Sequence, residues 1–91
     1  MHPNQPRIDH CNRALDAVRP VIPGDLYTEV HDYINQHDEW GLGIETLIDG
    51  LSELELPITA EQFVFIEIAM GAMDLADSSR ITYLREHNVA A

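Results

Sequence analysis

Apolar residues recur along this chain at intervals of three and four, the spacing that places side chains on one face of an α-helix. The first such run predicts a helix over residues 8–18, with Ile8, Cys11, Leu15 and Val18 on its inner face. Residues 1–6 precede it as a loose tail. Pro20 stops this helix, and the pair Pro23-Gly24 marks a turn.

A second helix is predicted to begin with Asp25 as its cap and to continue to about Gln36. Its inner stripe comprises Leu26, Val30, Tyr33 and Ile34. A polar break over residues 35–38 separates it from a third helix. The apolar positions of the third helix are Trp40, Ile44, Leu47, Ile48, Leu51 and Leu54. Because Gly43 lies inside this helix and weakens it by about 1 kcal/mol relative to alanine, we expect it to let another helix approach closely.

A fourth helix follows Pro57, and Thr59 with Gln62 forms the capping box that starts it. It is apolar almost all round, which is typical of a helix at the centre of a bundle. One stripe holds Phe63, Ile66, Met70 and Met73, and Val64, Phe65 and Ile68 widen it. Asp77-Ser78-Ser79 offers a further cap, and a short last helix carries Ile81 and Leu84 before it frays after about His87.

No window of the sequence alternates apolar and polar residues as a strand does. The predicted fold class is therefore all-α: a small antiparallel bundle of four main helices plus a short C-terminal helix, because short connections favour antiparallel neighbours. A chain of 91 residues suits one core. We expect one helical domain over residues 7–91 after the tail.

The distribution of charged residues adds information about function that the apolar pattern does not give. Between Arg19 and Arg80 lie sixty residues without a lysine or an arginine, and the net charge of the chain is −11. The stretch carries thirteen carboxylates: Asp25, Glu29, Asp32, Asp38, Glu39, Glu45, Asp49, Glu53, Glu55, Glu61, Glu67, Asp74 and Asp77. Such charge repels itself in a compact fold. We therefore expect a cationic partner, and neither nucleic acid nor an anionic membrane, which are polyanions.

The motifs of catalysis and metal binding are weak here. Cys11 is the only cysteine, so no intrachain disulfide can form, and packing is its expected role. His31 and His37 are six residues apart, which is the wrong spacing for a zinc helix. Asp77-Ser78-Ser79 lacks the leucine and the central position of an acyl-carrier motif. We expect no enzyme, no metal and no cofactor.

The segment from Tyr33 to Leu51 combines a polar turn with Glu39-Trp40-Gly41-Leu42 and Glu45. It resembles the signature of MafI-type immunity proteins, in which a helix ends in a polar turn followed by Glu, an aromatic, Gly-Leu and a second Glu. Residues 56–63 and 66–70 match the proline, capped helix start and apolar helix of that family, so the resemblance covers residues 26–75. Gly43 and Asp38 depart from it, where alanine and glycine are expected.

The resemblance implies that the chain neutralises a secreted polymorphic toxin, most often a nuclease, from the cytoplasm of the producing cell. Nucleases hold phosphates in basic clefts, which fits the acidic balance. The candidate contact residues are Asp32, Tyr33, Asp38, Glu39, Trp40, Glu45 and Asp49. Two alternatives stay open: a broad nucleic-acid mimic that inhibits DNA- or RNA-binding proteins, and an acidic interaction adaptor. The free protein is expected to be a monomer or a homodimer.

Overall fold

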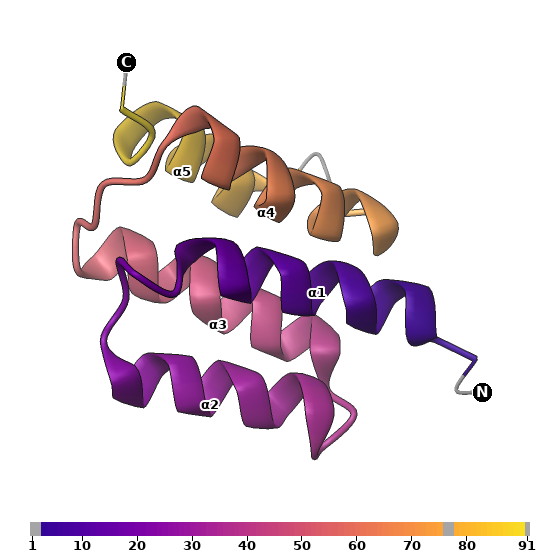
Figure 1. Ribbon diagram of the computed structural model, residues 1–91. Coiled ribbons are helices and arrows are strands. Elements are labelled where there is room, and N and C mark those ends of the chain that lie inside the picture. Colours follow the sequence, from indigo (N-terminus) through magenta and orange to yellow (C-terminus); the bar gives the residue numbers. More distant parts are fainter. Residues whose placement is uncertain (1–2, 76–77, 91) are drawn as a thin grey trace.

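The computed structural model describes residues 3–75 and 78–90, and within them it has five α-helices (Figure 1). They are α1 (Gln5–Val18), α2 (Gly24–Asn35), α3 (Trp40–Glu53), α4 (Ala60–Ala72) and α5 (Ser79–His87). In the same residues, β-pairing is confined to one isolated parallel bridge between Ile58 and Val89. Successive helices run in alternating directions. The predicted all-α fold class is confirmed.

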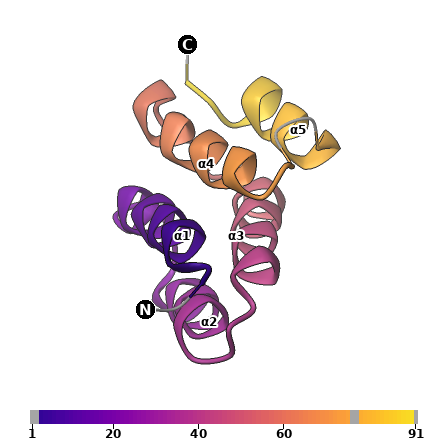
Figure 2. The same cartoon turned by 90° about the vertical axis from the view of Figure 1, so that its right-hand side faces the viewer.

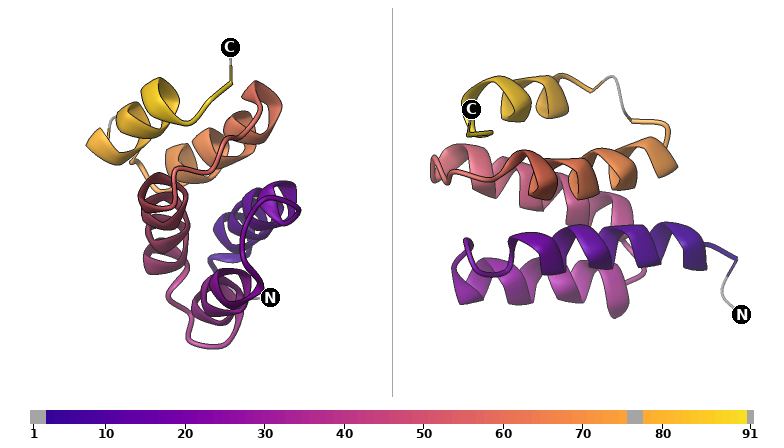
Figure 3. Two further views of the ribbon diagram at one scale, coloured as in Figure 1. Left: turned by 90° about the vertical axis from the view of Figure 1, so that its left-hand side faces the viewer. Right: turned by 45° about the horizontal axis from the view of Figure 1, so that its top comes forward.

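The helices lie in three tiers, with α2 in the lowest, α1 and α3 in the middle and α4 and α5 in the highest (Figures 2 and 3). The middle helix α3 packs against all four others, whereas α4 packs mainly on α1. The expectation that α4 is central is therefore wrong. Its outer side chains Val64, Phe65 and Ile68 are 46%, 36% and 45% exposed, because no element covers that face within the described residues.

The first helix begins three residues earlier than its apolar spacing indicates. Gln5 and Pro6, assigned to the tail, form its first turn. Proline is tolerated there because a backbone N–H in the first turn has no intrahelical acceptor. The Arg7 guanidinium donates from Nε to the carbonyl oxygen of Ala72 at 2.9 Å, which ties this turn to the end of α4.

Two of the predicted caps are confirmed and one is wrong. The α4 capping box is complete, since Thr59 Oγ1 accepts from the Gln62 N–H at 3.0 Å and the Gln62 side chain accepts from the Thr59 N–H at 2.8 Å. Ser78 caps α5 by accepting from the Arg80 N–H at 3.2 Å, while Asp77 lies outside the described residues. Asp25 is not a cap: α2 begins at Gly24, and Asp25 lies in its first turn.

The core is a single cluster to which every helix contributes. Its largest fully buried side chains are Leu15, Val18, Ile34, Ile44, Leu47, Ile48, Leu51, Ile58, Ile66, Met70, Ile81 and Leu84. Close approach of α2 to α3 depends on Gly43, as predicted. A Cβ atom there would lie 2.8 Å from Ile34 Cγ1 and 3.3 Å from the Val30 carbonyl oxygen. The hairpin of α2 and α3 is therefore held at a fixed, short separation.

Asn88 is a buried polar residue after α5, and its hydrogen bonds fasten the C-terminal segment. Its Nδ2 donates to the carbonyl oxygens of Leu51 and Leu56, each at 2.9 Å. Its own carbonyl accepts from the Ile58 N–H at 2.9 Å. These bonds satisfy backbone oxygens where α3 ends, at the point where the chain turns towards α4.

Candidate partner-binding surface

The α2–α3 hairpin, residues 24–53 with its connecting turn, carries most of the acidic stretch. A sharp turn joins the two helices: the Asp32 carbonyl oxygen accepts from the N–H groups of Gln36 and His37, and the Tyr33 carbonyl accepts from the Glu39 N–H at 2.8 Å. Asp38 has φ 54°, a left-handed conformation that aspartate tolerates better than most residues. The turn thus sets the direction in which the carboxylates beside it project.

Three of the predicted contact acids lie at this turn end. Asp38 and Glu39 are exposed, and Asp32 is half-buried with its Oδ1 3.5 Å from Nδ1 of His31. All three are on or next to the short connection, so the structure brings them together as the sequence indicated. A partner could reach them without any movement of the helices.

The two predicted aromatic anchors are both half-buried, and they lie in different surroundings. Tyr33 packs beside α3: a Cβ atom added at Gly43 would lie only 3.2 Å from the Cβ of Tyr33. Trp40 packs against the core, with the Arg7 guanidinium carbon 5.7 Å from its ring centroid. Its carbonyl oxygen accepts from the Cys11 thiol at 3.8 Å. Trp40 therefore contributes to the packing of α3 on α1, whatever part it has in binding.

Glu45 and Asp49 lie on another side of α3 and are already paired. Arg80 of α5 donates from Nη1 to Glu45 at 2.8 Å and from Nε to Asp49 at 3.0 Å. The hydrogen bond to Asp49, together with the charges of Asp49 and Glu45, raises the pKa of the Arg80 guanidinium above its ordinary value. These two acids are thus separated from the turn group and partly neutralised by an arginine beyond the acidic stretch.

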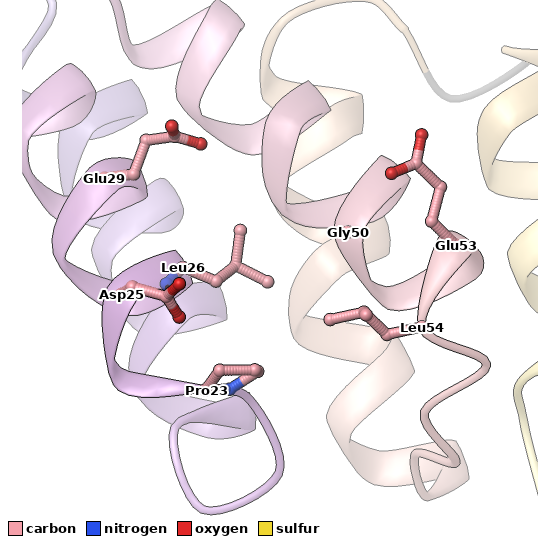
Figure 4. A pocket seen from close by; sticks show the side chains of 7 residues that line it. All are labelled: Pro23, Asp25, Leu26, Glu29, Gly50, Glu53 and Leu54. Atoms are coloured by element: carbon pink, nitrogen blue, oxygen red, sulfur yellow. Dashed lines mark hydrogen bonds between the residues drawn. The ribbon is translucent and has the colours of Figure 1, made fainter.

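A pocket between α2 and α3 brings together acids that were not among the predicted contact residues. Its cavity volume is about 430 Å³, and its lining comprises Pro23, Asp25, Leu26, Glu29, Gly50, Glu53 and Leu54. Figure 4 shows Asp25 and Glu29 on α2 and Glu53 on α3, with the side chains of Leu26 and Leu54 extending into the space between the two helices. Leu54, predicted to be core, is 53% exposed and forms part of the pocket floor.

Glycine at position 50 makes this pocket possible. A Cβ atom at Gly50 would lie 2.7 Å from Cδ2 of Leu26, so a larger residue would push Leu26 away from α3. Leu26 therefore lies directly on the α3 backbone. The sequence contained a usable signal: in an antiparallel hairpin centred near residue 38, Asp25 comes opposite the last turn of α3, where Glu53 lies, and Glu29 comes opposite the turn before it.

The chemistry of the remaining polar groups is limited. Burial raises the pKa of the Cys11 thiol from 9.0 to about 12, so this cysteine packs, as predicted, and does not react as a thiolate. Among the described residues, no group of three or more His, Cys, Asp or Glu side chains is arranged to hold a metal ion. None of the helices in this part of the chain is both long enough and apolar enough to cross a membrane.

Comparison with known proteins gives no assignment: no family model matches the chain, and no curated protein or solved structure is significantly similar to it. The resemblance to immunity proteins thus stays a prediction carried by residues 26–75.

Proposed function

We propose that this chain is an immunity protein that binds and neutralises a cognate secreted polymorphic toxin, a nuclease, by stoichiometric occlusion. The observation that carries the proposal is the surface of the α2–α3 hairpin. Residues 24–53 hold eight carboxylates and no lysine or arginine, and Arg80 pairs with two of the eight. A nuclease needs a basic cleft to hold a phosphate backbone, and this surface is its electrostatic complement.

The family resemblance also supports the proposal. Its most unusual part, Glu39 to Glu45, begins at the acidic turn and continues into the first two turns of α3. In such a family the inhibitor is made together with its toxin, so the proposal includes a cytoplasmic location in the producing cell. Glu39 and Glu45 belong to both the signature and the acidic surface, while Trp40, Gly41 and Leu42 belong to the signature alone.

Binding in this proposal has an early electrostatic step and a later packing step. The field of the hairpin attracts a basic toxin and can raise the association rate to about 10⁸–10⁹ M⁻¹s⁻¹ at low salt. Exposed ion pairs contribute only about 0–1 kcal/mol each, so slow release also requires contacts that exclude water. Tyr33, the exposed Leu42 and the apolar floor between α2 and α3 are groups on this surface that can supply them.

The test measures association of the chain with the toxin domain encoded beside it, by stopped flow at low and high salt. Asp32→Lys with Glu39→Lys reverses two charges at the turn and is expected to slow association tenfold or more and to flatten its salt dependence. Asp38 is left unchanged because of its left-handed backbone. The control, Asp9→Lys with Glu86→Lys, makes the same change in net charge on exposed positions of α1 and α5.

A slower association shared equally by both variants would show that net charge alone matters. Unchanged association of the turn variant at both salt concentrations would exclude this end of the hairpin as the steering surface. Capture of partners from the producing cell separates the alternatives. One basic toxin domain supports immunity, a range of nucleic-acid-binding proteins would indicate a mimic, and a large assembly would indicate an adaptor.

A further inference from the structure

The pocket between α2 and α3 combines an apolar floor with a rim of carboxylates from both helices (Figure 4). Leu26 and Leu54 form the floor, and Asp25, Glu29 and Glu53 form the rim. The ion pairs within the described residues involve other acids: Arg80 pairs with Glu45 and Asp49, and Arg85 pairs with Glu67. None of these ion pairs involves a rim acid, and in the same part of the chain Asp25 accepts only the Leu26 backbone N–H, at 3.0 Å, so the rim remains negatively charged beside exposed apolar carbon.

Elsewhere in the same protein, two acids at a similar spacing bind an arginine side chain. Glu45 and Asp49 are four residues apart on α3, and their carboxylates both accept from the one guanidinium of Arg80, at 2.8 and 3.0 Å. Arg80 itself lines a second, smaller hollow between α3 and α5, together with Asp49, Ser52 and Tyr83 among others. A pair of carboxylates one helical turn apart thus binds one guanidinium in this fold.

The α2–α3 pocket repeats that arrangement without an arginine of its own. Asp25 and Glu29 are also four residues apart and lie on one face of α2, while Glu53 lines the same pocket from α3. We infer that this pocket binds one arginine side chain of a basic protein partner. The three methylenes of the arginine lie along Leu26 and Leu54, and its guanidinium donates to the rim carboxylates.

Other occupants fit these observations less well. The three acids are not arranged as metal ligands. An uncharged apolar group would cover the rim carboxylates without pairing them, which is unfavourable. Arginine differs from lysine because its planar group presents five donors in a fixed fork and is more weakly hydrated, so it suits several carboxylates beside an apolar surface. The occupant that matches both floor and rim is therefore a guanidinium on an aliphatic stem.

This inference rests on the proposed function for the origin of the arginine, which would be the basic toxin. Arginine residues held in central, desolvated pockets are frequent binding hot spots. The pocket thus supplies the water-excluding contact that long-range attraction lacks. It also places the anchor at the open end of the hairpin, away from the turn that carries Asp38 and Glu39.

The experiment needs no toxin. The isotope-labelled chain is titrated at low salt with N-acetyl-arginine-methylamide, and backbone amide shifts are followed by NMR. Saturable shifts are expected at Leu26, Gly50 and Leu54. The matched neutral probe, N-acetyl-citrulline-methylamide, should cause none of them, because it keeps the shape of arginine without its charge. The lysine analogue should bind at least threefold more weakly.

Variants locate the site. Glu29→Gln with Glu53→Gln should weaken arginine binding at least tenfold, whereas Glu61→Gln with Glu86→Gln, which removes the same charge elsewhere, should change it less than twofold. All four residues are exposed, so both variants are expected to keep the wild-type melting temperature. Shifts spread evenly over all acidic positions, equal binding of citrulline or lysine, or equal weakening by both variants would overturn the inference.

The two proposals can fail separately. If arginine does not bind the pocket while the chain still neutralises its toxin, the pocket inference is wrong and the proposed function stands. If arginine binds the pocket but the neighbouring toxin is ignored, the pocket is an arginine site and the immunity function is wrong.

Discussion

The closeness of α2 to α3 leads to a stability prediction that can be worked out from two glycines. Replacing a helical glycine with alanine stabilises the folded state by about 1 kcal/mol when the methyl group has room. Neither Gly43 nor Gly71 has a positive φ, so alanine fits both backbones. The main difference between the two positions is therefore what the new methyl group meets.

At Gly43 the methyl group has no room. Its Cβ would lie 2.8 Å from Cγ1 of the buried Ile34, 3.2 Å from Cβ of Tyr33 and 3.3 Å from the Val30 carbonyl oxygen. Two of these atoms belong to or adjoin the backbone of α2, so the helices must separate. Overpacking of this kind costs about 1–3 kcal/mol. Because three atoms lie this close, the cost falls in the upper part of that range, about 2–3 kcal/mol. Subtracting the gain in helix propensity, about 1 kcal/mol, leaves Gly43→Ala less stable than the wild type by about 1–2 kcal/mol.

Gly71 is the matched control, because a Cβ there would meet nothing within 4 Å. It is the second-to-last residue of α4, so the gain from Gly71→Ala is about 0.5 kcal/mol. The variants should differ by about 2 kcal/mol, or about 8–16 °C in melting temperature for a domain of this size. Urea and thermal unfolding followed by circular dichroism measure both. A Gly43→Ala protein as stable as the wild type would refute the close approach.

Two further predictions concern buried polar groups. Asn88→Ala removes the donor to the carbonyl oxygens of Leu51 and Leu56, so urea unfolding should show a loss of about 1–3 kcal/mol, and an unchanged midpoint would contradict these hydrogen bonds. Burial raises the pKa of the Cys11 thiol from 9.0 to about 12, so the unfolded chain loses this proton at a lower pH than the folded protein does. The contribution of the thiol to stability is therefore complete below pH 9.0. Between 9.0 and about 12 the free energy of unfolding falls by about 1.4 kcal/mol per pH unit. Cys11→Ala should lack this part of the alkaline slope in pH-dependent unfolding, and an identical slope in both proteins would show that the thiol is not desolvated.

The prediction for α4 shows where sequence patterns lose information. Its apolar residues occur on every side, so the sequence indicates the stripe of Phe63, Ile66, Met70 and Met73 but not how far the buried surface extends around the helix. Phe63, Ile66 and Met70 face the core, while Val64 and Ile68 face solvent. The buried side of α4 is the side that packs against α1, α3 and α5. In α3 the apolar stripe is narrower, and its central positions were predicted correctly.

The candidate site divides in the same way. Asp32, Asp38 and Glu39 are neighbours in sequence beside a short turn, so their proximity could be predicted. Glu45 and Asp49 meet Arg80 across a separation of more than thirty residues, and the pocket joins α2 to the far end of α3. Contacts between residues of different helices depend on how the helices pack, and the spacing of residues within one helix carries no information about that packing.

The sequence by itself determined the number of helices, most of their boundaries and the surplus of negative charge. These properties follow from side-chain spacing, from capping groups within a few residues of a helix end and from composition, all of which act locally. The tertiary structure decided that α3 is the central helix, that Arg80 pairs with two acids, and that Leu26 and Leu54 form a floor between carboxylates of two helices. Those outcomes depend on the burial of apolar surface by the whole chain, which is a non-directional force that selects among many arrangements of the same helices.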